Sequence, residues 1–186
     1  ATRSYIQEPT SQTSFPYVIT VKGLQGGHSG MDIHKGFGNA NKILSRLLYN
    51  GFERFGLRVS KIDGGSLRNA IPRESTAIVV VDAVHKTTFE DATTTLISAI
   101  EKEFQTLEPD LNISLTPTNL PETVVELGVQ QPLLKALNVA HNGVFRMSPD
   151  IEGLVETSNN VARVLVEKGQ LKVGCLSEPA LRKGFL

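Results

Sequence analysis

The sequence is poor in cysteine, with a single residue, Cys175, among 186. One thiol cannot form a disulfide within the chain and cannot build a zinc site from several thiolates. We therefore expect a reducing compartment, the cytoplasm by default. Cys175 follows Leu171 and Val173 at alternate positions of a strand-like run, which predicts a buried thiol rather than a nucleophile.

Net charge is lacking too, because 19 basic residues balance 19 acidic ones. A neutral chain has no field that would attract nucleic acid or an anionic membrane. No apolar run approaches the roughly 18 residues of a membrane span, and the first ten residues hold no apolar signal core. We expect no nucleic-acid partner and no membrane partner. Since the first residue is not methionine, we also expect a piece of a longer protein.

The residues of a hydrolytic centre are missing as well. The four histidines, His28, His34, His85 and His141, are scattered; none is followed two positions later by Asp, and no two Glu are adjacent. A catalytic metal needs several His, Asp or Glu ligands close together, so we expect no metal site in this chain. Ser29 beside His28 is a weak nucleophile candidate, because sequence neighbours rarely meet in catalytic geometry.

What the sequence does contain is apolar periodicity, in a chain long enough to bury roughly 70% of its unfolded surface as one large or two small domains. Alternation predicts a strand over residues 17–22, and apolar residues three and four apart predict a helix over 37–55. Strands over 57–62 and 75–83 and a helix over 89–104 follow. The predicted order is strand, helix, strand, strand, helix.

A second, shorter unit follows the first. We expect a strand over residues 111–116, a helix opened by Pro132, and a hairpin of strands 160–167 and 170–177. Residues 141–158 have no clear period and are expected to form a long ordered loop. The predicted fold class is α+β, with ferredoxin-like split βαβ units and an antiparallel sheet that carries helices on one face; the second unit is truncated.

Polar residues at loop and strand ends are the remaining candidates for function. Gly26, Gly27 and Gly30 surround His28 at the end of the first strand, where a side chain can be presented to a ligand. A glycine-rich connection with a solvated histidine would have the same sequence. The other candidates are Arg68, Asn69, Thr157, Ser158 and Asn159.

Four segments in order carry a family resemblance: VKGLQGGHSGMDIHKGFGNANKIL, GGSLRNAIPRE, GLVETSNNV and VGCL. Together they resemble the aminoacyl-histidine dipeptidases, also called Xaa-His or carnosine-type dipeptidases, of the di-zinc metallopeptidase superfamily. The resemblance runs from Phe15 to about Leu176 and covers only the lid, or dimerisation, domain of those enzymes. It implies a linker over residues 1–14 and a lid domain over 15–186.

The resemblance also implies roles for individual residues. His28 matches the lid histidine that stabilises the oxyanion of the tetrahedral intermediate, by analogy in the active site of the partner subunit. Asn69 matches an asparagine that helps to hold the substrate's C-terminal end, and we group Arg68, Ser158 and Asn159 with it as substrate-binding candidates. The two zinc ions of the family belong to the other, catalytic domain.

The end of the chain departs from the family pattern. A family arginine that pairs with the substrate carboxylate should come soon after Cys175-Leu176, but Ser177 and Glu178 stand there, and Arg182 is the nearest substitute. Two functions therefore compete. The chain is either the lid of a homodimeric zinc dipeptidase, inactive alone, or a self-standing ferredoxin-like module that binds a small ligand or only dimerises.

Overall fold

The computed structural model describes residues 1–179, and Arg182 lies outside this part of the chain. Three α-helices and twelve strands are found there, together with two short 3₁₀ turns, η1 (Ile33–Lys35) and η2 (Ala83–His85). The helices are α1 (Ala40–Phe55), α2 (Lys86–Phe104) and α3 (Leu127–Val139). The strands are β1 (Thr2–Ser4), β2 (Gln7–Pro9), β3 (Ser14–Lys22), β4 (Gly27–His28), β5 (Arg58–Gly64), β6 (Ala70–Ile71), β7 (Ser75–Asp82), β8 (Asn112–Pro117), β9 (Thr123–Val125), β10 (Gly143–Met147), β11 (Val155–Glu167) and β12 (Gln170–Pro179).

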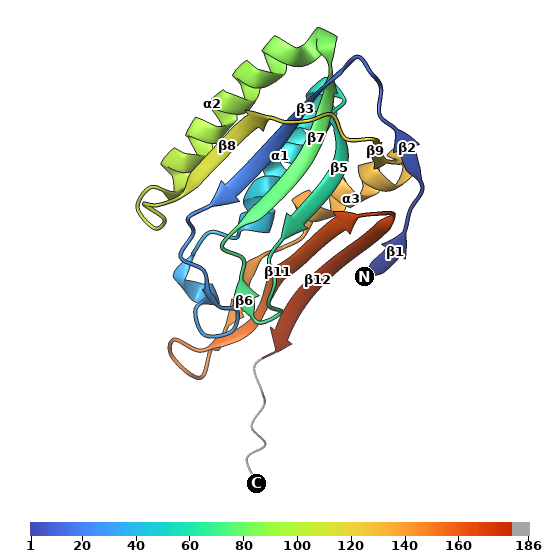
Figure 1. Cartoon of the computed structure of the whole chain (residues 1–186). Coiled ribbons are helices and arrows are strands. Elements are labelled where there is room, and N and C mark those ends of the chain that lie inside the picture. The colour runs from blue at the N-terminus through green and yellow to red at the C-terminus, as the bar shows by residue number, and fades with distance from the viewer. Residues whose placement is uncertain (180–186) are drawn as a thin grey trace.

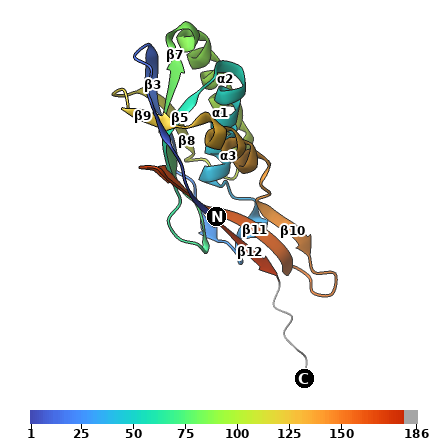
Figure 2. The same cartoon turned by 90° about the vertical axis from the view of Figure 1, so that its right-hand side faces the viewer.

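One large antiparallel sheet organises the molecule. Its strand order is β1-β12-β11-β5-β7-β3-β8, and β10 pairs with β11 beside this path. The helices cover one face of the sheet and leave the other open (Figures 1 and 2). The predicted α+β class, with split βαβ units and helices on one face, is confirmed. No helix among residues 1–179 combines the length and the apolar character needed to cross a membrane.

The core lies between the sheet and its helices. Tyr17, Ile19 and Val21 of β3 alternate inward and are almost fully buried, as the period of two predicts. Helix α1 turns a stripe of buried residues onto them, among them Ile43 and Leu47. The apolar pattern of the first unit therefore corresponds to a real packed layer.

Helix α1 has well-defined ends. The Asn39 side chain accepts a hydrogen bond from the backbone N–H of Lys42 at 3.2 Å, which caps the first turn. Gly56 ends the helix with φ 63°, a left-handed conformation that glycine adopts without steric cost. Lys42 of this helix reaches α3, donating through Nζ to the carbonyls of Leu137, Asn138 and Ala140 at its C-terminal end.

The second unit differs from its prediction in three places. Helix α3 begins at Leu127, five residues before Pro132, so the proline lies inside it. Part of the expected loop 141–158 is strand β10, whose residues lack alternation because the strand is half-buried or exposed throughout. Cys175 is exposed, whereas Leu171 and Val173 are half-buried, because the β11–β12 ribbon runs on beyond the helices (Figure 2).

The first 14 residues, expected to form a linker, contain two paired strands. Strand β1 pairs with β12 and strand β2 pairs with β9. The N-terminal ammonium of Ala1 also donates to the carbonyl of Val173 at 2.7 Å. The N-terminal segment is therefore attached to the sheet in this structure.

Candidate functional site

A two-residue ladder brings the glycine-rich loop to the segment that carries Asn69. Strand β4 pairs with β6 so that His28 lies opposite Ala70. The backbone N–H of Ser29 donates to the carbonyl of Asn69 at 2.9 Å. Two segments about 40 positions apart in the sequence thus meet at one end of the molecule, and His28 and Asn69 are both exposed there.

The imidazole of His28 is held by its own loop. Nδ1 accepts hydrogen bonds from the backbone N–H groups of Gly30 and Met31, at 3.1 and 3.2 Å. A ring nitrogen that accepts cannot carry the proton in the neutral imidazole, so this network assigns the proton to Nε2. The side chain therefore offers an Nε2–H donor, and nothing in the loop accepts from it.

Asp32 closes the same loop. Its Oδ2 accepts from the backbone N–H of His28 at 2.8 Å, and its Oδ1 is 2.7 Å from the ammonium of Lys35. The hydrogen bond from Lys35, followed by that from the His28 backbone, holds the pKa of the Asp32 carboxyl below its usual value.

The base of the loop is clamped by a buried carboxylate. Glu108 is 1% exposed; its Oε1 accepts from the backbone N–H of Gly38 and its Oε2 from that of Gln25, each at 2.7 Å. These two donors flank the whole segment that contains His28. No periodic pattern predicts this role, because Glu108 lies 70 or more positions from both donors.

Glycine is required at two points of this end. A Cβ at Gly27, where φ is +150°, would lie 2.9 Å from Cβ of Asp32, so a larger residue would displace the carboxylate. Gly65 has φ +69°, and a Cβ there would lie 2.0 Å from the carbonyl oxygen of Ala162. Gly27 thus leaves room for the Asp32 side chain, and Gly65 allows the backbone of Ala162 to approach closely.

The remaining sequence candidates fall into two groups. Arg68 is exposed beside Asn69 in the turn before β6. Ser158, by contrast, is only 4% exposed within β11. The amide of Asn159 donates to the carbonyl of His141 at 2.6 Å and accepts from the Ser177 hydroxyl at 2.8 Å. Arg68 and Asn69 are thus open to solvent, whereas Ser158 is buried and the Asn159 side chain is engaged within the fold.

A buried amide network, which sequence reasoning missed, links β11 to the site. The amide of Asn160 donates to the carbonyl of Ala70 at 2.8 Å, directly opposite His28. Its oxygen accepts from Asn39 at 3.0 Å, and Asn39 also donates to Asn142. Asn39 and Asn160 both lie in segments that carry the family resemblance, but amide pairs over 100 positions apart leave no local pattern that predicts their contact.

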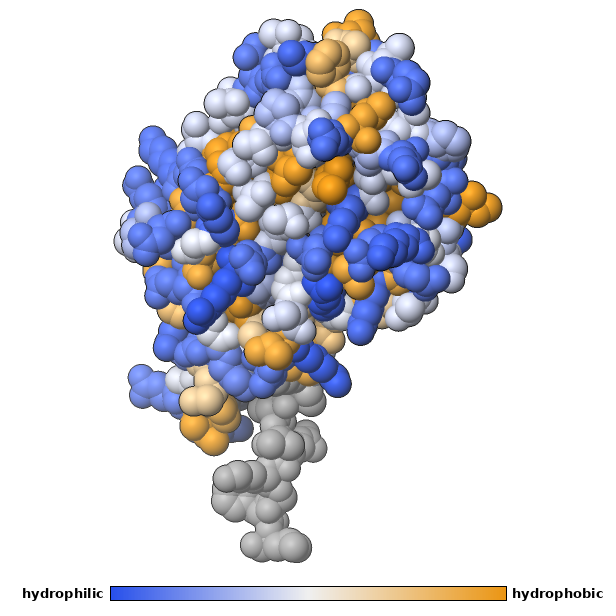
Figure 3. Space-filling view, viewed as in Figure 1, coloured by the Kyte–Doolittle hydropathy of each residue, from blue (hydrophilic) through white to orange (hydrophobic). Residues whose placement is uncertain are grey.

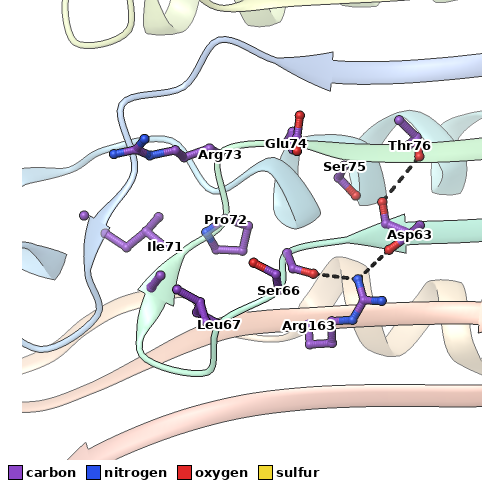
Figure 4. A pocket seen from close by; sticks show the side chains of 13 residues that line it. Asp63, Ser66, Leu67, Ile71, Pro72, Arg73, Glu74, Ser75, Thr76 and Arg163 are labelled. Carbon is purple, nitrogen blue, oxygen red and sulfur yellow. Dashed lines mark hydrogen bonds and ion pairs between the residues drawn. The ribbon is translucent and has the colours of Figure 1, made fainter.

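A groove of about 820 Å³ lies on the open side of the sheet next to this ladder. Figure 4 shows Ile71 toward one end and Asp63, Thr76 and Arg163 toward the other. The Arg163 guanidinium is bound to Asp63 and to the carbonyl of Gly65, each at 2.5 Å. The groove therefore has polar walls of both charge signs.

Exposed apolar side chains gather at the end that carries His28. Met31 (73% exposed) follows the histidine, Leu67 (62%) precedes β6, and Phe145 (62%) lies on β10, which contacts the η1 turn after the loop. Ile151 and Leu154, in the connection to β11, are exposed as well. Figure 3 shows apolar side chains at the lower end of the open face. Apolar surface of this kind is typical of an interface.

No metal centre is found in the part of the chain that the structure describes. Within residues 1–179, no three His, Cys, Asp or Glu side chains lie close enough to share an ion. These described residues therefore do not by themselves provide the ligands for a pair of zinc ions.

Comparison with known proteins places this geometry in a family. Residues 19–108 match the model of the peptidase dimerisation domain. The chain is 35% identical over 168 residues to the cytosol non-specific dipeptidase of Escherichia coli (strain K12), covering 90% of this chain and 35% of that protein. The crystal structure of aminoacylhistidine dipeptidase from Vibrio alginolyticus superposes with a TM-score of 0.92 at 35% identity, over 98% of this chain and 37% of that one.

The chain thus spans about a third of the length of these two dipeptidases. The matched region begins in β3 and includes the His28 loop, the β4–β6 ladder and both helices of the first unit. The resemblance to the aminoacyl-histidine dipeptidases is confirmed. Residues 19–108 of this chain match the peptidase dimerisation domain family.

Proposed function

We propose that this chain is the lid and dimerisation domain of a zinc-dependent, cytoplasmic dipeptidase that hydrolyses Xaa-His dipeptides. The observation that carries the proposal is the exposed His28 imidazole, whose Nδ1 is engaged by its own loop and whose Nε2–H is free to donate. The family match supplies the context, because the chain corresponds to about a third of two dipeptidases.

The proposed task of His28 is to stabilise negative charge. When water attacks a peptide carbonyl, charge develops on the carbonyl oxygen, and a donor already aimed at that oxygen lowers the barrier. One such donor contributes on the order of 3 kcal/mol in comparable oxyanion holes. Because the Gly30 and Met31 amides fix the ring, little reorganisation is needed when the charge appears.

Asn69 and Arg68 are proposed to contact the substrate. Both are exposed in the turn that leads into β6, and the ladder holds this turn next to His28. The Asn69 amide can donate to a carboxylate, and the Arg68 guanidinium can pair with one. This pair would bind the C-terminal end of a dipeptide in place of the arginine that is missing after Leu176.

The reacting centre itself is proposed to lie outside this chain. The described residues contain no group that could hold two zinc ions, so the ions belong to the remaining part of the parent enzyme. The exposed apolar side chains around His28 fit this arrangement, because they would be covered when the lid meets the other domain. The isolated chain is then expected to be inactive.

We further propose a homodimer formed through the edge that β8 and α2 share. Strand β8 pairs with β3 and has no second neighbour in the sheet over residues 1–179. Between Asp91 and Lys102, the exposed face of α2 carries only small uncharged residues. They are Thr94, Thr95, Ser98 and Ala99. An open strand edge beside such a helix favours pairing with a second copy.

One observation favours the alternative of a self-standing ligand-binding module. The groove of about 820 Å³ is large enough for a small molecule and has charged walls. A module of this kind would need neither the free Nε2–H of His28 nor a second domain.

The test is a pair of substitutions in the full-length peptidase that contains this chain. His28→Ala should lower kcat about a hundredfold with little change in KM, because the lost contact forms mainly in the transition state. His34→Ala, an exposed histidine six positions away, is the matched control and should leave both constants near wild type. An effect on KM alone would reduce His28 to a binding residue, and no effect would favour the self-standing module.

A further inference from the structure

We infer that Asp32 is a positioning residue that keeps the His28 loop in its donating form. The inference rests on the function proposed for His28 and adds a residue that makes no contact with substrate. It is carried by five contacts within the eight residues from His28 to Lys35.

The backbone of His28 is bonded on both sides by Asp32. The His28 N–H donates to Oδ2 of Asp32 at 2.8 Å, and the Asp32 N–H donates to the carbonyl oxygen of His28 at 2.9 Å. The two bonds close a ring between residues four positions apart. The backbone on either side of the histidine Cα is therefore fixed by a single neighbour.

This ring determines where the imidazole points. Gly30 and Met31 lie inside the closed turn, and their N–H groups reach Nδ1 at 3.1 and 3.2 Å only while the turn is closed. Both amides are bound to the edge of the ring that faces the loop, so Nε2 is directed away from it. Opening the turn would release the ring and let either nitrogen face outward.

Two further features fit Asp32 to this task. Lys35 occupies Oδ1 at 2.7 Å, which leaves Oδ2 to the histidine N–H, and its hydrogen bond lowers the pKa of the carboxyl. Gly27 leaves room for the carboxylate, since a Cβ at that position would lie 3.0 Å from Oδ2. Gly27 and Asp32 thus act together to hold the backbone of His28.

The test compares Asp32→Ala with Asp32→Asn in the full-length peptidase. Asp32→Ala should lower kcat about tenfold and change KM less than twofold, because the donor is still present but no longer aimed. Asp32→Asn keeps an oxygen that can accept from the His28 N–H and should recover most of the activity. Asp110→Ala, which removes an exposed carboxylate outside the loop, is the control and should match wild type.

A measurement on the 186-residue chain separates this inference from the function on which it rests. Amide hydrogen exchange at His28 and Met31 should accelerate at least tenfold in Asp32→Ala and stay slow in Asp32→Asn. Unchanged exchange, or wild-type kcat in Asp32→Ala while His28→Ala is impaired, would overturn the role of Asp32. Wild-type kcat in His28→Ala would instead overturn the proposed function, and the exchange result would still decide whether Asp32 holds the loop.

Discussion

The body of the domain and the end that carries His28 are stabilised in different ways. In the body, β3 and α1 bury alternating or striped apolar residues between a sheet and its helices. At the His28 end, apolar side chains such as Met31 and Phe145 are exposed, and backbone N–H groups donate hydrogen bonds to buried or partly buried carboxylates. The first region makes the domain stable, and the second fixes the position of a few side chains.

This difference shows which part of the domain can carry functional side chains without loss of stability. Substitutions in a close-packed core affect stability, because even one added or removed methylene changes the packing. A loop bonded by Asp32 and Glu108 can present an exposed imidazole without disturbing that core. The apolar side chains around it remain free for an interface.

The largest difference in the free energy of unfolding is expected when a phenylalanine is replaced by alanine in each region. Phe89, 1% exposed, packs with its ring centroid 5.5 Å from that of Tyr17 and 5.7 Å from that of Phe55. Phe89→Ala should lower the free energy of unfolding by about 3–5 kcal/mol, the usual cost of truncating a buried aromatic. Phe145→Ala, in the exposed position on β10, should change it by less than about 0.5 kcal/mol. Urea denaturation measures both, and similar losses would remove the distinction between the regions.

A smaller effect is expected where the two regions join. Glu108→Gln leaves one oxygen for two backbone donors and places an amide NH₂ against the other donor. The free energy of unfolding should fall by about 2 kcal/mol, since a buried donor loses its partner. The control is Glu103→Gln, whose partly exposed carboxylate pairs with Arg46 on the surface and should cost less than about 0.5 kcal/mol. Equal effects would show that the loop does not depend on this clamp.

The smallest expected effect is a pH dependence of the free energy of unfolding that arises from Tyr17, in the body of the domain. Burial, followed by the hydrogen bond to Glu90, raises the pKa of Tyr17 well above its usual value. A group whose pKa is raised by folding contributes stability below its unfolded pKa of about 10 and loses it at higher pH. The free energy of unfolding should therefore fall as the pH rises above about 10, and Tyr17→Phe should flatten this slope. A slope that persists in Tyr17→Phe would assign the titration to another group.

The body could be predicted from the sequence because its signals are periodic. Alternation in β3 and the stripe of α1 each span several turns or residue pairs, so the pattern survives local exceptions. The predicted start of α3 is wrong, because proline favours the first turn of a helix but Pro132 lies inside this one, which begins at Leu127. Strand β10 was missed because a strand that is half-buried or exposed throughout shows no alternation.

The His28 end could be predicted only in part. Its glycines and the family resemblance pointed to His28 and Asn69, and the structure brings their segments together. Strands of two residues have no period, so the β4–β6 ladder could not be seen in the sequence. The partners Asp32, Glu108 and Asn160 were missed because polar contacts of this kind depend on geometry that the sequence pattern does not encode.

The central claim, that this chain supplies His28 to an active site outside itself, is tested most directly by complementation. Full-length His28→Ala peptidase is co-expressed with the wild-type 186-residue chain, and mixed dimers are isolated through different affinity tags. The account predicts that these dimers regain dipeptidase activity, whereas dimers made with the His28→Ala form of the 186-residue chain do not. Mixed dimers that form but stay as inactive as the His28→Ala enzyme would contradict donation of His28 between subunits.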